Sequence, residues 1–134
     1  MSAFLDVLTE AGVELLVDVR AVASSRRPGF SKTKLAANLD GVDIDYIHLR
    51  GLGTPADGRA AARAGRHGEM REIFLDHLTT AVAQTDLATL IDLVSSGRKL
   101  SLLCFEADPA HCHRSMVASA VQSIVPVTVT HLIP

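Results

Sequence analysis

Short runs of apolar residues, many of them branched, recur along the chain and leave room for a helix between one run and the next. They predict four strands, over Glu14–Val19, Ile44–Leu49, Lys99–Cys104 and Val127–Ile133. Runs that are apolar on both faces are typical of strands covered by helices on both sides. Strands joined through helices of about ten or more residues need crossover connections, so the sheet should be mainly parallel.

Apolar positions spaced three and four apart predict the helices between these strands. We expect helices over Phe4–Ala11, from Ser31 to about Gly41, from Glu69 to Ala83, from about Asp86 to Gly97, and over Ser115–Ile124. Val22–Phe30 and Arg50–His67 are expected to be loops because Gly, Pro, Ser and Arg are frequent in them. Together these elements predict a three-layer α/β domain with a sheet of about four strands.

Length and composition agree with one globular domain over residues 1–134. Hydrophobic residues make up 48% of the chain and charged residues 21%, which excludes disordered and fibrous classes. No apolar run approaches the ~20 residues that span a bilayer, and the start lacks the basic segment of a signal peptide. Two cysteines are too few for a disulfide scaffold, so we expect a cytoplasmic protein that does not bind membranes.

The net charge of −2 hides an uneven distribution. The segment from Arg20 to Arg71 has ten basic and five acidic residues, whereas the rest has three basic and ten acidic residues. Clustered basic residues favour an anionic partner, either a small ligand or nucleic-acid phosphate. The alternative is a solvated basic face without a partner. Aromatic residues are 4% and Trp is absent, which argues against a surface that stacks bases.

The segment from Cys104 to Arg114 contains most of the candidate catalytic and anion-binding residues. It follows a predicted strand, and ligands of open α/β sheets bind outside the carboxyl ends of the strands. A helix that opens near Cys112 would lower the pKa of its thiol and make it nucleophilic. Glu106 could act as a base, and His113 could adjust protonation. Arg114 could clamp a phosphate or carboxylate through its two-pronged guanidinium.

Each of these residues also has a simpler interpretation. Cys104 is either a contact to the substrate or a packed thiol at a strand end, and Cys112 is either reactive or a local cap of the helix. His111, Cys112 and His113 are adjacent in sequence, so their side chains cannot all converge on one metal ion. We therefore expect no metal and no cofactor.

Further candidates lie after the first strand. Asp18 and Arg20 are two apart on an extended segment and share a face, so Asp18 could hold Arg20 in place to bind an anion. The alternative is a structural ion pair. Ser25 and Arg26 belong to a polar basic loop that could close over a phosphate or be solvated. Tyr46 and His48 share one face of the second strand. Either could reach a site, but we expect them to pack under a helix.

Several of these motifs together resemble a known family. The elements Asp18-Val19-Arg20, Tyr46-Ile47-His48-Leu49, Leu52-Gly53, Cys104-x-Glu106 and Cys112-His113-Arg114 are similar, over roughly residues 15–132, to the family named domain of unknown function 488. The resemblance implies a Rossmann-like α/β domain and leaves the activity unspecified. The family pattern usually opens with another strand, whereas this chain starts at the helix that follows it. One wall of the site is then expected to be absent.

Three functions are consistent with these residues. The first is an enzyme-like domain that binds an anionic or phosphorylated substrate through Arg20 and Arg114, with Cys112 or Glu106 as nucleophile or base. The second is a non-catalytic module that binds nucleic acid or a nucleotide through the basic segment. The third is a structural homo-oligomer in which the Cys-His-Arg segment only caps a helix.

Overall fold

The structure is a computed structural model, and it describes residues 2–23, 28–103, 113–125 and 127. Strands β1 (Leu15–Asp18), β2 (Asp45–His48) and β3 (Leu100–Leu103) form one parallel sheet in the order β2-β1-β3. The predicted parallel α/β architecture is confirmed, with three strands in the described ranges rather than about four. The fourth predicted strand, over 127–133, lies outside the described residues except for Val127.

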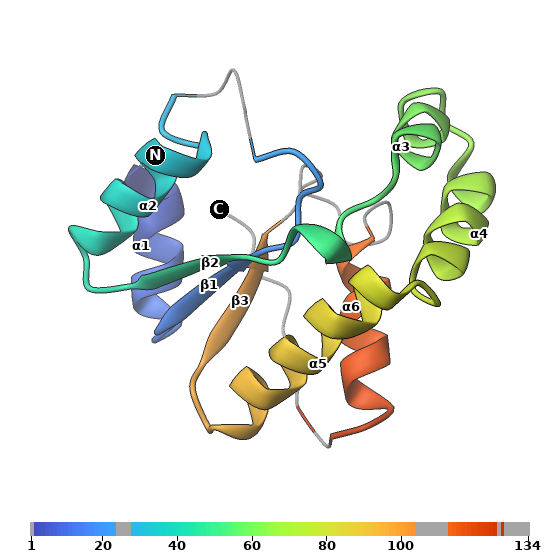
Figure 1. The fold of residues 1–134 in the computed structure, drawn as a ribbon. Helices are drawn as coiled ribbons and strands as arrows, with labels where there is room; N and C mark the ends of the chain where they lie inside the picture. The colour runs from blue at the N-terminus through green and yellow to red at the C-terminus, as the bar shows by residue number, and fades with distance from the viewer. Residues whose placement is uncertain (1, 24–27, 104–112, 126, 128–134) are drawn as a thin grey trace.

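Helices cover both faces of this sheet (Figure 1). On one face, α1 (Ser2–Glu10) and α2 (Lys32–Asp40) enclose a cluster that includes Leu16. On the other face, α5 (Ala81–Ser95) and α6 (Arg114–Gln122) pack against Leu15 and Val17. Neighbouring residues of a strand point to opposite faces, so the continuous apolar run of β1 supplies both cores.

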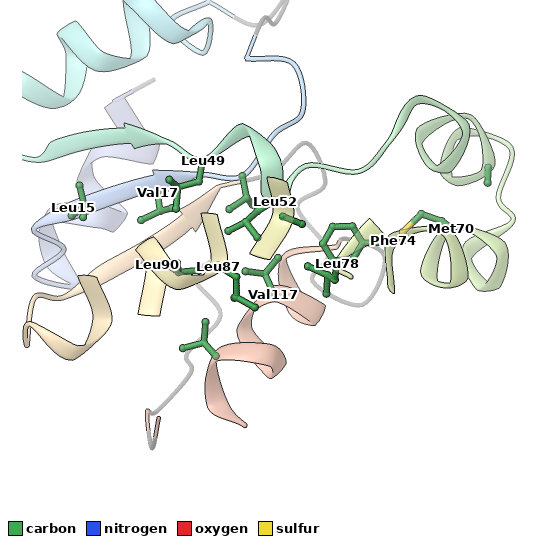
Figure 2. Close-up of a cluster of buried hydrophobic side chains, with 14 residues drawn as sticks. Leu15, Val17, Leu49, Leu52, Met70, Phe74, Leu78, Leu87, Leu90 and Val117 are labelled. Carbon is green, nitrogen blue, oxygen red and sulfur yellow. The ribbon is translucent and has the colours of Figure 1, made fainter. Parts of the chain in front are cut away.

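The larger core extends beyond the end of the sheet. Figure 2 shows Leu15 and Val17 of β1 near Leu87 and Leu90 of α5, with Phe74 farther along the same cluster. Phe74 is fully buried and belongs to α4 (His67–His77). The cluster therefore connects the central sheet to helices that lie past the carboxyl ends of its strands.

The prediction of a loop over Arg50–His67 is wrong, because most of this segment is helical. It contains a short 3₁₀ helix, η1 (Arg50–Leu52), and α3 (Ala56–Arg63), which packs against α4. Ala and Arg are strong helix formers, and they outweigh the single Gly58 inside α3. A Cβ at Gly58 would lie 2.6 Å from Cγ2 of Thr54, so the glycine permits close packing rather than marking a loop.

The boundary between the next two helices also differs from the prediction. The chain turns at Leu78–Thr80, and α5 begins at Ala81 instead of near Asp86. Thr80 is the N-cap, and its hydroxyl accepts a hydrogen bond of 3.3 Å from the amide of Ala83. Apolar residues continue at helical spacing across the turn, so periodicity alone could not locate it.

Two glycines, Gly51 and Gly53, bring the loop after β2 close to its neighbours. The amide of Gly51 donates to Oδ2 of Asp86 at 2.7 Å, which ties η1 to α5. A Cβ at Gly53 would lie 2.3 Å from the backbone nitrogen and Cα of Ala21. The loops that follow β1 and β2 therefore touch at Gly53 with no room for a side chain.

Replacing Gly53 with alanine should destabilise the protein strongly. The added methyl group meets backbone atoms of Ala21, which cannot turn aside as a side chain can. We expect Gly53→Ala to lower the free energy of unfolding by at least about 2 kcal/mol, measured by urea denaturation. Gly68→Ala is the matched control, because no heavy atom lies within 4 Å of its Cβ position in α4. The control should be neutral or stabilising by up to about 1 kcal/mol. Equal stability of the two variants would contradict the close contact at Gly53.

Candidate functional site

The three strands end side by side. Asp18, the last residue of β1, is paired with His48 of β2 and Leu103 of β3, the last residues of their strands. The pairing continues one step further, because the amide of Val19 donates to the carbonyl of Leu103 at 3.0 Å. Chain segments that leave these strands therefore start from one edge of the sheet, where α/β proteins bind ligands.

A buried ion pair lies at this edge. Nε of Arg20 donates to Oδ1 of Asp18 at 2.8 Å, and Nη2 donates to Oδ2 at 2.7 Å. The backbone amide of Arg20 adds a third hydrogen bond to Oδ1, at 3.1 Å. Asp18 is 0% exposed and Arg20 only 2%. The predicted shared face of these residues is confirmed, and their two-pronged contact fixes the plane of the guanidinium.

Tyr46 completes the surroundings of Asp18. Its hydroxyl donates to Oδ2 of Asp18 at 2.6 Å from the neighbouring strand. Burial alone would raise the pKa of Asp18, but hydrogen bonds from Arg20 and Tyr46, with the Arg20 charge, bring that pKa below its usual value. Burial and the nearby Asp18 raise the pKa of Tyr46. Asp18 is therefore ionised and Tyr46 neutral near pH 7.

Three histidines bind backbone carbonyls around the same edge. Nε2 of His48 lies 2.6 Å from the carbonyl oxygen of Arg20, and Nε2 of His113 lies 2.8 Å from that of Val19. Nε2 of His77 lies 2.8 Å from the carbonyl oxygen of Gly51. A carbonyl oxygen only accepts hydrogen bonds, so each of these Nε2 atoms carries a proton and donates.

His113 is the residue that brings α6 to the strand ends. It is buried at the N-cap position of α6, and its ring centroid lies 5.1 Å from that of Phe74. Burial lowers the pKa of His113, partly countered by the Val19 carbonyl, and the charge of Arg114 lowers it further. His113 is therefore neutral near pH 7, with Nδ1 as its acceptor nitrogen. Arg114 is half-buried and opens the first turn of α6.

The structure thus brings together part of the predicted site. Asp18, Arg20 and His113 lie around one strand end, and Arg114 follows directly in α6. The other predicted site residues lie outside the described residues: Ser25, Arg26, Cys104, Glu106 and Cys112.

Tyr46 packs against the core beneath α1 and α2, as expected. The polar ends of Tyr46 and His48 also contact the Asp18–Arg20 pair, so the alternative that these residues reach the site holds as well. The sequence did contain one signal for this contact, the alternation of side chains along a strand. It places Tyr46 and His48 on one face of β2, and Asp18 lies on the same face of the sheet when β1 pairs with β2 in parallel. What the sequence did not reveal was the register, Asp18 opposite His48.

Within residues 2–23, 28–103, 113–125 and 127, no group of three or more His, Cys, Asp and Glu residues is arranged to hold a metal ion. No helix in the part of the chain that the structure describes is long and apolar enough to cross a membrane.

Comparison with protein families gives one match. The family model described as Domain of unknown function DUF488 matches residues 1–121, which include the strand ends, the ion pair and most of α6. The resemblance expected from the motifs is confirmed by this match. No curated protein and no solved structure matches the chain.

The low pKa of His113 predicts a dependence of stability on pH. An unfolded histidine has a pKa near 6.5, and burial lowers the folded-state value, so the unfolded chain binds more protons in the acid range. The stabilising contribution is complete above about pH 7 and is lost as the pH falls through 6.5 toward the folded-state pKa. The slope from this residue is at most about 1.4 kcal/mol per pH unit.

Urea denaturation of the wild type and of His113→Gln, between about pH 7.5 and 5, measures this contribution. Glutamine keeps an N–H donor for the Val19 carbonyl but does not titrate. The stability difference between the two proteins should shrink as the pH falls. A difference that stays constant over this range would show that His113 is not held neutral by burial.

Proposed function

The chain belongs to the DUF488 family, and we propose that it binds a phosphorylated or otherwise anionic small molecule at the carboxyl edge of its sheet. The observation that carries this proposal is the buried side-on pair of Asp18 and Arg20. Asp18 engages Nε and Nη2 of Arg20, so the guanidinium edge formed by Nη1 and Nη2 is directed away from the carboxylate. An arginine edge held in one plane suits two oxygens of a phosphate or carboxylate.

Charge near the strand ends supports the same ligand. Arg20 and Arg114 bring two positive charges, and Asp18 brings one negative charge. The start of α6 adds the partial positive charge of a helix N-terminus. Burial strengthens these interactions because little water screens them.

In this proposal the reacting groups come from the segment between Cys104 and Arg114. Cys112 or Glu106 would act as nucleophile or base, with Cys104, Ser25 and Arg26 contributing to substrate binding. His113 is neutral and donates Nε2–H to the Val19 carbonyl, so it would hold the start of α6 beside the strand ends. The protein would then be a small enzyme-like domain.

The first experiment is thermal denaturation with inorganic phosphate and with nucleotides. A ligand at about a hundred times its dissociation constant should stabilise the wild type by about 2.7 kcal/mol. Arg114→Ala and Arg20→Lys should each lose most of this gain, since lysine cannot present two parallel N–H groups. The matched control is Arg98→Ala, because Arg98 binds Asp45 at the opposite end of β2, at 2.6 Å. Arg98→Ala should keep the full gain. No gain in the wild type with any anion, or an equal gain in all four proteins, would overturn the proposal.

A second candidate is binding of nucleic-acid phosphates by the helices past the strand ends. Arg50, Arg59 and Arg63 of η1 and α3 have no ion-pair partner among the described residues. Nε of Arg59 is buried without a hydrogen-bond partner in the described structure. Arg59 and Arg63 are four residues apart on α3 and therefore lie on one side of the helix, which favours a partner with several phosphates.

Salt dependence tests this candidate. Binding of a short oligonucleotide should weaken steeply as salt rises, with a slope of about −0.7 per single-strand phosphate contact. The double variant Arg59→Gln with Arg63→Gln should lower the slope by roughly one to two contacts. Fluorescence anisotropy at several salt concentrations measures both quantities. A flat salt response, or an unchanged slope in the double variant, would exclude this surface as a phosphate-binding site.

A further inference from the structure

The Asp18 carboxylate accepts four hydrogen bonds from two residues. Oδ1 accepts from the backbone amide and Nε of Arg20, at 3.1 and 2.8 Å. Oδ2 accepts from Nη2 of Arg20 at 2.7 Å and from the hydroxyl of Tyr46 at 2.6 Å. Three of the four donors therefore belong to Arg20, the residue whose orientation matters for the ligand. Among the described residues, Tyr46 donates to Asp18 from another strand.

Tyr46 adds a contact to Asp18 from a second strand. All the bonds between Asp18 and Arg20 lie within one short chain segment, and the Arg20 amide fixes only Oδ1 from the main chain. The Tyr46 hydroxyl approaches Oδ2 from β2, which is hydrogen-bonded to β1 along its whole length. Together with the Arg20 amide it fixes the plane of the carboxylate relative to the sheet. Because a two-pronged pair is nearly coplanar, fixing the carboxylate fixes the guanidinium.

The main chain of Arg20 is held from the same strand. His48, two residues after Tyr46, donates Nε2–H to the Arg20 carbonyl oxygen at 2.6 Å. Residues two apart on a strand point to the same face, so β2 presents both groups to Arg20 together. His48 contacts the peptide group of Arg20, and Tyr46 contacts the Asp18 carboxylate that binds the Arg20 guanidinium.

We propose that Tyr46 is a positioning residue that orients Arg20 through Asp18, so that the outer edge of its guanidinium meets an oxyanion of the phosphate class. The inference rests on the proposed anion site and adds the residue that sets its geometry. Tyr46 does not itself contact the anion. It acts by limiting the orientations that Arg20 adopts before the ligand arrives, which reduces the ordering cost of binding.

The test combines one measurement that needs no ligand with one that does. The first is the rate at which the Nε–H proton of Arg20 exchanges with water, followed by NMR and assigned by its loss in Arg20→Lys. The second is the dissociation constant for inorganic phosphate. Tyr46 is the chain's only tyrosine and there is no tryptophan, so its absorbance and fluorescence report on this position alone.

Tyr46→Phe keeps the ring and removes the hydroxyl. Exchange of the Arg20 Nε–H should become roughly threefold to tenfold faster, and the phosphate dissociation constant should rise by a similar factor, as for the loss of one net hydrogen bond. Ile47→Val is the matched control, because Ile47 packs into the opposite core from the same strand. It should lower stability without changing either readout. In the wild type, phosphate should also alter the absorbance of Tyr46.

The outcomes separate this inference from the proposed function. Unchanged exchange in Tyr46→Phe overturns the positioning role, even where the wild type binds phosphate. Faster exchange in a protein that binds no phosphate overturns the anion site and supports the link from Tyr46 to Arg20. Should Tyr46→Phe be too unstable to measure, 3-fluorotyrosine at this position serves instead. Its more acidic hydroxyl donates more strongly and should slow the exchange, and an unchanged rate would again overturn the inference.

Discussion

A single buried carboxylate organises the carboxyl edge of this sheet. Removing a charge from water costs several kcal/mol unless its oxygens are fully hydrogen-bonded. Asp18 meets that condition with four donors from Arg20 and Tyr46. The same bonds that offset its burial also hold the arginine and link β1 to β2. Structure and candidate function therefore depend on one group. Loss of Arg20 would leave a buried charge unpaired, and loss of the Tyr46 hydroxyl would leave Oδ2 with one donor fewer.

Three histidines provide hydrogen-bond donors for backbone carbonyl groups at the same edge of the sheet. Where strands end, carbonyl groups leave the hydrogen-bonded ladder and need other donors once they are buried. His48, His77 and His113 each supply an Nε2–H, to Arg20, Gly51 and Val19 respectively. Each contact joins segments distant in sequence, so the imidazoles hold β2, α4 and α6 against the loops at this edge. Each imidazole uses its Nε2 for this contact.

The sequence predicted the architecture well and the site in part. Periodicity located the strands and most helices, because burial on one or both faces leaves a clear apolar pattern. It did not locate α3, because the Gly, Pro and Arg residues around that helix indicated a loop, nor the turn at Thr80, where apolar spacing continues across the break. The closeness of Asp18 and Arg20 followed from their spacing alone. The contact from Tyr46 depends on strand register, which arises from long-range pairing and leaves no local mark in the sequence.

The segment Arg50–His67, which follows β2, tolerates a change in length at one end and not at the other. At its start, Gly51 is tied to Asp86 and Gly53 touches the backbone of Ala21, so one residue more or fewer would pull this edge out of register. Between α3 and α4, Gly65 has a positive φ of 80° and open space around its Cβ position. Insertions there would lengthen the helical hairpin at its outer tip (Figure 1). The helical hairpin can therefore accept changes of length that the edge of the sheet cannot.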